Sequence, residues 1–573
     1  MMYRNRCYYY KPDKETALFV LFFVGMAVYY GWRMFGLTPW YDELYTYYFF
    51  ISRGPVYAAI HWPLPNNHIG YSVLSACLGI FGNSAIALRG ISYLCSLGSL
   101  ILLFRIARRC FRRGMALIPV FLYTGMKLVN QLAVQGRGYA LVTFCYLVAI
   151  WELLQITVEC RNRIRDYIVF GISLVLALYA IPSSLYVVVP VCLTGGVMLL
   201  VRGEYRRLAC LIITSIASAA CTVGLYGVVW LAIGSNLLMK TEGSSYYGMG
   251  HGTIIFHAPF EAMKTGITYM LATPYIQSVG RDGFMGKFIS WLCSLLNEYY
   301  EGGSMVLTIL LILCGFWVLS CIGKRLNNMR YDKMSEEEAT YDSFIEFYLA
   351  VSLLGIPLML VILCSLPYYR VFSFAGVAIA FALTWLLQML VERFGCRFGQ
   401  GKLQAEESVQ TAKNMQLDLQ VEASVRGGRH IKSYLPWIGS GVAGVMCVIL
   451  LLGPSYRTQY SDREAAIEDA CRQIDLSQVQ KVAITDCDQE YLLLFLYNID
   501  GEQITRDLAE AEVVLADKYL LLDYDTDVID WSADGWKMYL TQEEFAASNV
   551  TERMEAVYEN DRFILYQDKT KGE

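Results

Sequence analysis

The stretch TALFVLFFVGMAVYYGWRMF, residues 16–35, is followed directly by GLTPWYDELY, residues 36–45. The first stretch has Arg33 as its one charged side chain. The hydrocarbon core of a bilayer is about 30 Å thick, and a helix needs about 20 apolar residues to cross it because unpaired backbone groups are too costly in lipid. Residues 16–35 therefore predict a membrane-spanning helix. No small-residue cleavage site follows this long stretch, so we expect the helix to be retained in the mature protein.

The rest of the chain has the same character. Of its 573 residues, 56% are hydrophobic and 17% are charged, whereas about 25% are charged in an ordinary soluble domain. This composition argues against a soluble enzyme, a nucleic-acid binder, a disordered chain and a secreted disulfide scaffold. Ten further apolar stretches bring the predicted number of transmembrane helices to about eleven. They lie at residues 84–104, 115–131, 139–158, 167–181, 184–201, 208–232, 304–322, 344–366, 371–391 and 433–453.

Lysine and arginine are concentrated on alternate connections between these spans. One set of connections, which includes the N-terminal segment, has 26 of them, and the other set has eight. Cytoplasmic connections of membrane proteins have the excess of positive charge. We therefore expect a cytoplasmic N-terminus, and an odd number of crossings places the C-terminal segment outside the cytoplasm.

The chain divides near residue 454. Residues 1–454 form the predicted transmembrane domain, with long outer loops at 36–83 and 233–303. Residues 392–432 are polar and indicate a solvated cytoplasmic linker. Within the first outer loop, the apolar run Ile69–Phe81 is too short to cross the bilayer, so we expect a helix that lies on the outer leaflet.

Residues 455–573 have 11 basic and 27 acidic side chains. They predict a small extracytoplasmic α/β domain, because short β-rich runs alternate with helix-like segments. We expect the domain to stabilise the membrane domain or to contact a substrate. The expected strands are residues 481–485, 512–516 and 562–566, and the sequences Ser461–Glu464 and Thr541–Glu544 fit helix-starting capping boxes.

The strongest local signal is the adjacent pair Asp42 and Glu43, just after the first span and beside Tyr45. A carboxylate at an apolar boundary can act as a general base, since partial desolvation raises its proton affinity. The alternative is that both are solvated loop charges beneath a Trp and Tyr interface belt.

A polar cluster, Asn66, Asn67 and His68, directly precedes the apolar run Ile69–Phe81. Such a cluster suits the binding of a polar group at the membrane surface. Asparagine is also a preferred residue at helix starts, so helix capping is the alternative, and the two roles are compatible.

Two arginines, Arg137 and Arg370, lie at the mouths of spans on the side where cations are scarce. Arginine can hold a phosphate through two parallel N–H bonds, so we expect both to bind one. Snorkelling to the interface is the alternative. A third arginine, Arg89, lies inside a span, and we expect it to reach the outer surface or to pair within the bundle.

These features occur in a fixed order over residues 10–455: an Asp-Glu pair after the first span, a Pro-Leu segment before a short helix, an outer Arg-x-Tyr and a late Pro-x-x-Arg. The ordered set resembles the GT-C class of integral membrane glycosyltransferases, specifically the superfamily of protein O-mannosyltransferases and the lipid A aminoarabinose transferase. The chain departs from the family pattern at two places. It has Asn66-Asn67-His68 where the aminoarabinose branch has a lysine, and Leu44-Tyr45 where Arg-Tyr is often found.

The resemblance implies a GT-C-like fold, an all-α polytopic membrane bundle with a small α/β domain after it. It also implies that a sugar, of hexosyl or mannosyl type, moves with inversion from a polyprenyl-phosphate carrier to a hydroxyl of a glycan, lipid or protein acceptor. The reaction would take place on the outer face of the bacterial plasma membrane, among membrane lipids and without nucleic acid. It implies no required cofactor and no metal site, although some branches of the wider class use a divalent metal.

The resemblance also implies roles for individual residues. Asp42 would be the general base, and Glu43 would orient the acceptor or position the loop. The remaining residues would bind the donor phosphate (Arg370, Arg137 and His68) or contact donor or acceptor (Tyr45, Asn66, Asn67 and Tyr139).

Other functions remain open at this point. A transporter or flippase of lipid-linked saccharides would show internal repeats, broken spans and ionisable residues near mid-membrane. A polysaccharide polymerase or ligase would not need the Asp-Glu pair after the first span. A non-enzymatic scaffold would use the membrane domain only to present the acidic domain. The ionisable residues lie mainly at the outer mouth, which favours glycosyl transfer.

Overall fold

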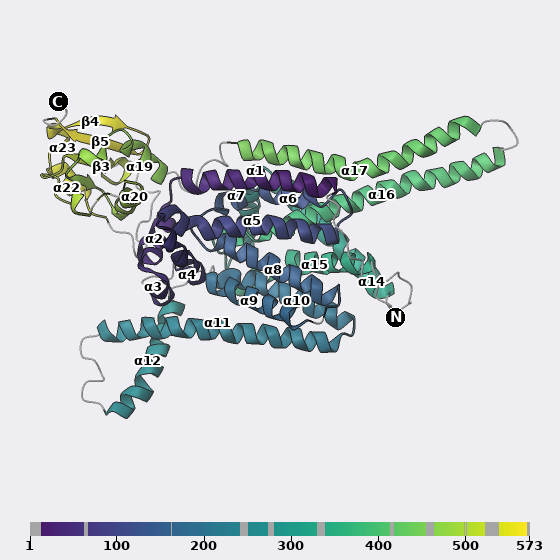
Figure 1. Cartoon of the computed structure of the whole chain (residues 1–573), viewed down its shortest axis with the longest axis horizontal. Coiled ribbons are helices and arrows are strands. Elements are labelled where there is room, and N and C mark those ends of the chain that lie inside the picture. Colours follow the sequence, from purple (N-terminus) through teal and green to yellow (C-terminus); the bar gives the residue numbers. More distant parts are fainter. Residues whose placement is uncertain are drawn as a thin grey trace.

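The computed structural model describes residues 13–61, 67–161, 163–240, 250–272, 280–328, 338–412, 418–453, 463–497, 499, 501–521 and 538–569. Long helices run side by side, and a small domain with a β-sheet lies at one end of them (Figure 1). The helices of the first part are α1 (Lys14–Gly36), α2 (Tyr41–Phe49), α3 (Pro55–Ile60), α4 (Ile69–Leu78), α5 (Ser84–Cys110), α6 (Leu117–Thr124), α7 (Lys127–Leu132), α8 (Tyr139–Thr157), α9 (Ile164–Ala180), α10 (Leu185–Val201), α11 (Tyr205–Lys240), α12 (His251–Ala272), α13 (Phe284–Tyr299), α14 (Ser304–Asn328), α15 (Glu338–Leu363), α16 (Ala375–Ala412) and α17 (Asp418–Leu452).

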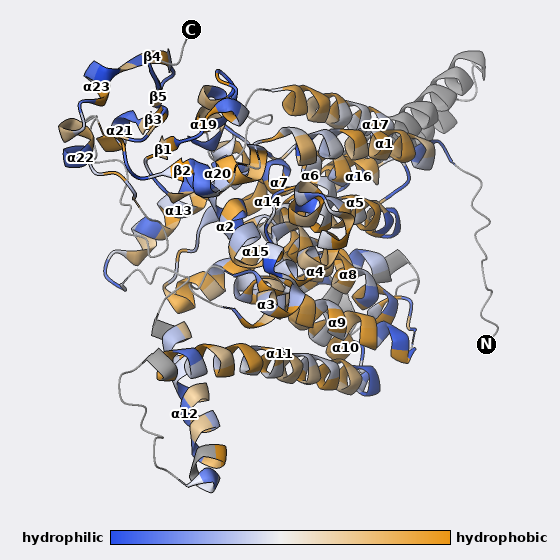
Figure 2. Ribbon diagram, turned by 60° about the vertical axis from the view of Figure 1, so that its left-hand side comes forward, coloured by the Kyte–Doolittle hydropathy of each residue, from blue (hydrophilic) through white to orange (hydrophobic). Residues whose placement is uncertain are grey.

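Within the described ranges, nine helices are long and apolar enough to cross a membrane. Hydrophobic residues cover much of their length (Figure 2). Large apolar side chains on them are exposed, such as Leu21 at 72% and Phe316 at 71%. Exposed apolar surface on this scale is unfavourable in water and suits lipid. The prediction of a helical polytopic membrane bundle is confirmed.

The expected count of eleven spans is not confirmed. Residues 115–131 form two short helices, α6 and α7, because the backbone of Met126 between them is extended, with ψ 126°. Residues 167–181 belong to α9, which has 17 residues and packs against α8 and α11. Local hydropathy marked both segments as apolar, but it does not detect a backbone break or measure helix length to within a few residues.

The short apolar run before the second span is helical, as expected. It forms α4 and one 3₁₀ turn, Gly79–Phe81. Most of α4 is buried in protein: Ile69, Tyr71 and Ser72 have no exposed surface, and the helix packs against α3, α5 and α9. Gly70 lies so close to α9 that a Cβ there would be 3.0 Å from the backbone nitrogen of Ala180. Only the C-terminal end of the run is widely exposed.

The segment 392–432, expected to be a solvated linker, lies largely within helices. α16 extends to Ala412, and α17 begins at Asp418. The segment has five Gln, four Glu and four Arg, which have high helix propensity, so a polar composition here did not exclude helix.

The last part of the chain is the expected α/β domain. Its five strands are in the order β2-β1-β3-β5-β4, with β2, β1 and β3 parallel and β5 antiparallel to both β3 and β4. All three predicted strands are present, as β1, β3 and β5. The elements are α19 (Arg463–Cys471), β1 (Val482–Ile484), α20 (Cys487–Tyr497), β2 (Ile504–Thr505), β3 (Val513–Asp517), α21 (Lys518–Leu521), α22 (Gln542–Ala547), α23 (Val550–Arg553), β4 (Met554–Glu559) and β5 (Phe563–Asp568).

The two predicted capping boxes have different outcomes. Thr541 and Glu544 form one at the start of α22. The second box includes Ser461, which lies outside the described residues. Its other member, Glu464 of α19, accepts a hydrogen bond from the backbone N–H of Tyr41, at 2.7 Å. That contact joins the C-terminal domain to α2, which lies beside it at the end of the bundle (Figure 1).

Candidate functional site

The site is built around the short helix α2. Trp40 precedes the helix with an extended backbone, and its N–H donates to the Glu43 carboxylate at 3.2 Å. Glu43 and Asp42 thus lie in the first turn, where acidic side chains interact favourably with the helix dipole. Consecutive helical residues differ in direction by about 100°, so the two carboxylates point to different surroundings.

The Glu43 carboxylate is fully buried and paired. Arg89 on α5 donates to both of its oxygens, at 2.8 Å each, and the backbone N–H of Gly136 donates at 2.6 Å. The remaining nitrogen of Arg89 donates to the carbonyls of Met34 and Leu37 at the end of α1. This network joins α1, α2, α5 and the loop before α8. Its position favours the loop-positioning role of Glu43 over contact with an acceptor.

The Asp42 carboxylate lies at the mouth of the bundle and is 14% exposed. Its Oδ2 is 3.4 Å from Nη2 of Arg370 and 3.7 Å from Nη2 of Arg137. Both distances are within ion-pair range. The structure therefore brings together Asp42, Arg137 and Arg370. The sequence had singled out all three, and they are far apart in the chain.

The loop Gln135–Gly138 holds Arg137 in place. Arg137 is 1% exposed, and it donates to Thr46 Oγ1 at 2.8 Å, one helical turn after Asp42. A side chain at either flanking glycine would crowd its neighbours. A Cβ on Gly136 would lie 2.4 Å from Leu88, and one on Gly138 would lie 3.3 Å from His68 Nδ1. The Gly-Arg-Gly sequence thus lets the backbone approach α5 and His68 closely.

His68 lies directly before α4 and behind Arg137. Its Nδ1 accepts the backbone N–H of Gly138 at 2.9 Å, and its ring packs edge-on against Tyr139 at 5.2 Å. Burial, with the positive charges of Arg137 and Arg370, holds the pKa of the His68 imidazole well below its usual range. The ring is therefore neutral at pH 7. It supports Arg137 but adds no positive charge for an anion.

Arg370 lies on the 3₁₀ turn Tyr369–Phe372 and is the most exposed cation of the site, at 20%. Its guanidinium lies over two aromatic rings, with centroids at 5.2 Å for Trp40 and 4.9 Å for Tyr368. These cation–π contacts orient the guanidinium. They also keep it at the surface, where an incoming anion can reach it.

The other predicted contact residues occupy different places. Tyr45 is 2% exposed and stacks on Phe49 at 4.3 Å, so its ring packs inside the protein. Asn67 is buried and donates to the carbonyls of Ala58 and His61, at 2.9 and 3.1 Å, which joins the start of α4 to the end of α3. Tyr139 packs on His68 beside the arginines. Asn66 lies outside the described residues.

Three residues of the site were not singled out in the sequence: Thr46, Trp40 and Tyr368. Thr46 is at helical i+4 spacing from Asp42, and Trp40 and Tyr368 are aromatic neighbours of the two motifs. That spacing and those aromatic positions were visible in the sequence. Their pairing with Arg137 and Arg370 depends on the tertiary fold.

A small crevice opens beside the arginines. It is too narrow to admit a water molecule, and it is lined in part by Tyr139, Ser184, Val371 and Ser373. Tyr139 packs on His68, and Val371 follows Arg370 in the chain, so the crevice borders the charged cluster.

The charges of the site sum to a positive value. Glu43 and Arg89 neutralise each other, His68 is neutral, and Asp42 faces both Arg137 and Arg370. One positive charge therefore remains, and such a site attracts an anion. Among the described residues, no group of three His, Cys, Asp or Glu side chains is arranged to hold a metal ion.

Comparison with known proteins bears on this site. Residues 69–232, from α4 to within α11, match the family model described as dolichyl-phosphate-mannose-protein mannosyltransferase. The predicted resemblance to GT-C glycosyltransferases is confirmed. The matched part begins at the residue after His68 and includes α4, Arg89 and Arg137. No curated protein matches the sequence.

Solved structures of GT-C enzymes are similar to this chain over nearly its whole length. ArnT from Cupriavidus metallidurans in the apo state has a TM-score of 0.47, with 11% identity, over 96% of this chain and 98% of that one. The same enzyme bound to undecaprenyl phosphate has a TM-score of 0.45 at the same identity and coverage. The oligosaccharyltransferase from Archaeoglobus fulgidus, in complex with Zn and sulfate, has a TM-score of 0.43 and 11% identity, over 95% of this chain and 73% of that one.

The buried pair of Glu43 and Arg89 generates a stability prediction. Removing one partner leaves an uncompensated buried charge, so Glu43→Gln or Arg89→Met should lower the free energy of unfolding by about 3–5 kcal/mol. The double variant should lose much less than the sum of the two. The measurement is denaturant unfolding of the purified protein in detergent. Arg112→Ala is the control, because Arg112 is 65% exposed in its pair with Glu392 and should cost no more than about 1 kcal/mol. Additive losses would contradict a direct pair.

The neutral state of His68 generates a pH prediction. An unfolded histidine takes up a proton near pH 6.5, whereas folded His68 does so only at lower pH because its pKa is lowered. The unfolded state therefore binds more protons below about pH 6.5, and stability falls as the pH drops, by at most about 1.4 kcal/mol per pH unit from this group. His68→Gln should flatten the pH dependence of the free energy of unfolding between pH 7 and 5.5. An unchanged slope in that variant would show that His68 titrates normally.

Proposed function

We propose that this protein is an inverting glycosyltransferase that moves a sugar from a polyprenyl-phosphate carrier to an acceptor hydroxyl. The observation that carries the proposal is the Asp42 carboxylate, 3.4 and 3.7 Å from two arginines at the mouth of a membrane bundle. Asp42 would be the general base, and Arg370 and Arg137 would bind the carrier phosphate. The family match supports glycosyl transfer, and its description names a polyprenyl-phosphate sugar as the donor of that family.

A site at the end of a membrane bundle suits a lipid-linked donor. A polyprenyl-phosphate sugar has a tail in the bilayer and a charged head group at its surface. The site has apolar walls, two cations and a carboxylate at one end of the bundle, which matches the arrangement of such a molecule.

Donor binding would release the base. In the structure Asp42 faces both arginines, so its charge is partly neutralised. A phosphate on Arg370 and Arg137 would compete for the same guanidinium groups and leave the carboxylate free to accept a proton. The general base would then become active only when the donor is in place, which limits wasteful reaction with water.

The proposed reaction is a single displacement. Asp42 takes the proton of the acceptor hydroxyl, and the acceptor oxygen forms a bond to the anomeric carbon from the face opposite the phosphate. The bond between that carbon and the phosphate oxygen breaks, and its electron pair leaves with the polyprenyl phosphate. The developing negative charge is stabilised by the arginines, the kind of preorganised electrostatic contribution that is large in enzymes.

We also propose that this end of the bundle, with the C-terminal domain, faces the exterior of a bacterial plasma membrane. Supporting this orientation, the connections at the site end are poor in Lys and Arg, and the connections at the other end are rich in them. The acceptor would then be a hydroxyl on a glycan, lipid or protein outside the cytoplasm. The reaction would need no cofactor, because two arginines supply the positive charge that the leaving phosphate requires.

Asp42→Asn should reduce transfer by about 10²–10⁴-fold, the usual contribution of a general base, while folding and carrier binding persist because the side chain keeps its size. The measurement is transfer by purified protein in liposomes, with a panel of polyprenyl-phosphate sugars. Glu301→Gln is the control, since the Glu301 carboxylate is 60% exposed. Near-normal transfer by the Asp42 variant would reject the base. Carrier movement across the vesicle membrane without transfer would favour a flippase.

Arg370→Ala should raise the donor KM by about 10–100-fold, equivalent to the 1.5–3 kcal/mol of a hydrogen bond to a charged group, with a smaller change in acceptor KM. Arg370→Lys should recover part of the loss, because lysine keeps the charge but not the two-pronged geometry. Arg281→Ala, a change at an exposed arginine before α13, is the matched control. A donor KM unchanged by Arg370→Ala would remove this residue from the phosphate site.

A further inference from the structure

Helix α2 lies between the membrane bundle and the C-terminal domain. One of its faces, with Asp42 and Thr46, meets Arg137. Another face, with Leu44, Tyr47 and Tyr48, meets α20 of the C-terminal domain. Leu44 has no exposed surface and belongs to the hydrophobic core of that domain, and the rings of Tyr47 and Tyr48 contact Phe495 and Tyr491 with centroids at 5.1 and 5.4 Å.

Two carboxylates of α19 hold the residues that lead into α2. Glu464 accepts the backbone N–H of Tyr41, the first residue of the helix, at 2.7 Å. Glu468, one helical turn later, accepts the hydroxyl of Thr38. The backbone N–H groups at a helix start have no partner within the helix, so Glu464 supplies from another domain the partner that a capping residue usually provides. Its negative charge is also favourable at this end of the helix.

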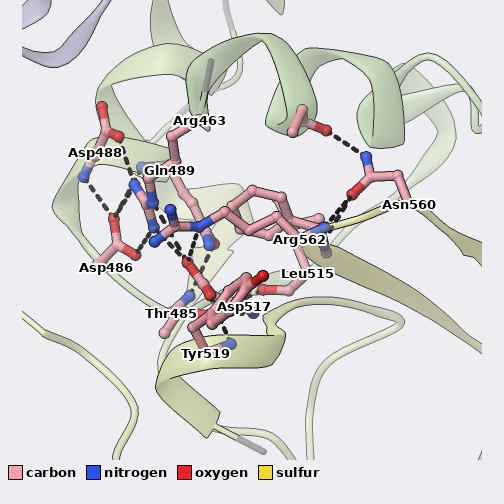
Figure 3. Close-up of polar contacts among 12 residues, drawn as sticks. Arg463, Thr485, Asp486, Asp488, Gln489, Leu515, Asp517, Tyr519, Asn560 and Arg562 are labelled. Atoms are coloured by element: carbon pink, nitrogen blue, oxygen red, sulfur yellow. Dashed lines mark hydrogen bonds and ion pairs between the residues drawn. The ribbon is translucent and has the colours of Figure 1, made fainter. Parts of the chain in front are cut away.

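The start of α19 is itself fixed by ion pairs. Figure 3 shows Arg463 pointing from α19 into a group of three aspartates, Asp486, Asp488 and Asp517. Asp486 and Asp488 follow β1, and Asp517 ends β3. Arg463 is 6% exposed, and removal of a buried pair's partner is costly, so this group rigidly places Glu464, the next residue.

The position of this group has a topological reason. The chain leaves β1 toward β2 on one side and leaves β3 toward β4 and β5 on the other, so a topological switch point lies between the carboxyl ends of β1 and β3. In parallel α/β sheets this switch point is usually an open crevice that binds a ligand. Here the guanidinium of Arg463 fills it. The edge of the sheet that would hold a ligand instead supports the contact with α2.

We propose that the C-terminal domain positions the proposed general base, and that Glu464 is the positioning residue, acting on Asp42 through the backbone of Tyr41. This inference rests on the proposed function. Glu464 touches the residue directly before Asp42, whereas the arginines that would hold the donor come from α8's entry loop and the turn at Arg370. Loss of the Glu464 contact should therefore impair the chemical step more than donor binding.

The first test compares Glu464→Ala with Glu464→Gln. Glutamine keeps an oxygen that can accept the Tyr41 N–H, and alanine does not. We expect Glu464→Ala to lower kcat at least tenfold with the donor KM changed less than threefold, and Glu464→Gln to recover most of kcat. Glu543→Ala removes an exposed carboxylate from the same domain and should leave kcat unchanged. A wild-type kcat in Glu464→Ala, equal losses in both Glu464 variants, or a loss confined to donor KM would overturn the proposal.

A second pair of variants removes the donor of the same hydrogen bond. Proline is tolerated at the first position of a helix and has no N–H, and the extended backbone of Trp40 is compatible with a following proline. Tyr41→Pro should therefore lower kcat further than Tyr41→Ala, which keeps the N–H. In the Glu464→Ala background the two Tyr41 variants should have the same kcat. A difference that persists in that background would refute the proposed contact.

Hydrogen exchange separates this inference from the proposed function. Amide exchange over residues 37–49 is measured whether or not transfer occurs, and Glu464→Ala should accelerate it relative to wild type and Glu543→Ala. Absence of transfer by the wild-type protein with every donor would refute the function alone. Unchanged exchange over this segment would refute the positioning role, even in a protein that transfers sugar.

Discussion

The buried ion pair between Glu43 and Arg89 is the constraint on which the site depends. A carboxylate and a guanidinium in a region without water are each costly, and they persist because each satisfies the other, together with Gly136 and two carbonyls of α1. The pair fixes the rotation of α2 about its axis. Because neighbouring helical residues point about 100° apart, fixing Glu43 inward determines where Asp42 points. Two adjacent acidic residues thereby acquire different roles.

The site also shows how charge is arranged where a membrane protein meets water. The buried components are neutral overall: Glu43 cancels Arg89, and His68 is uncharged. The remaining charges, Asp42, Arg137 and Arg370, lie together at the mouth of the bundle, and Arg370 is the most accessible of them. A net positive charge at the end of a bundle of apolar helices favours a molecule with an anionic head group and a lipid tail. In the proposed reaction, that same molecule displaces the arginines from Asp42 and so makes the base available.

The C-terminal domain packs more closely against the bundle than its acidic, hydrophilic composition suggests. Its hydrophobic core includes Leu44 from α2, and Arg463 occupies the switch point of its sheet. The ion pairs of Arg463 at the switch point make this edge of the sheet rigid. Rigidity is useful if the edge holds a short helix, since α2 has nine residues and too few internal hydrogen bonds to be stable alone.

The sequence by itself determined the membrane class, most of the long helices, the helix after His68, three of the five strands of the C-terminal domain, and the gathering of Asp42, Arg137 and Arg370 at one end. Hydropathy and residue periodicity are local properties, so a linear pattern suffices for these features. Only the tertiary structure decided that Glu43 pairs with Arg89, that residues 115–131 break into two helices, and that Glu464 accepts the N–H of Tyr41 at the start of α2. The first and the last of these depend on which group, distant in the sequence, comes close enough to pair with a buried charge or with a backbone N–H that has no partner in its own helix. Tyr41 and Glu464 are 423 positions apart in the chain, and no pattern along the chain encodes such a distance.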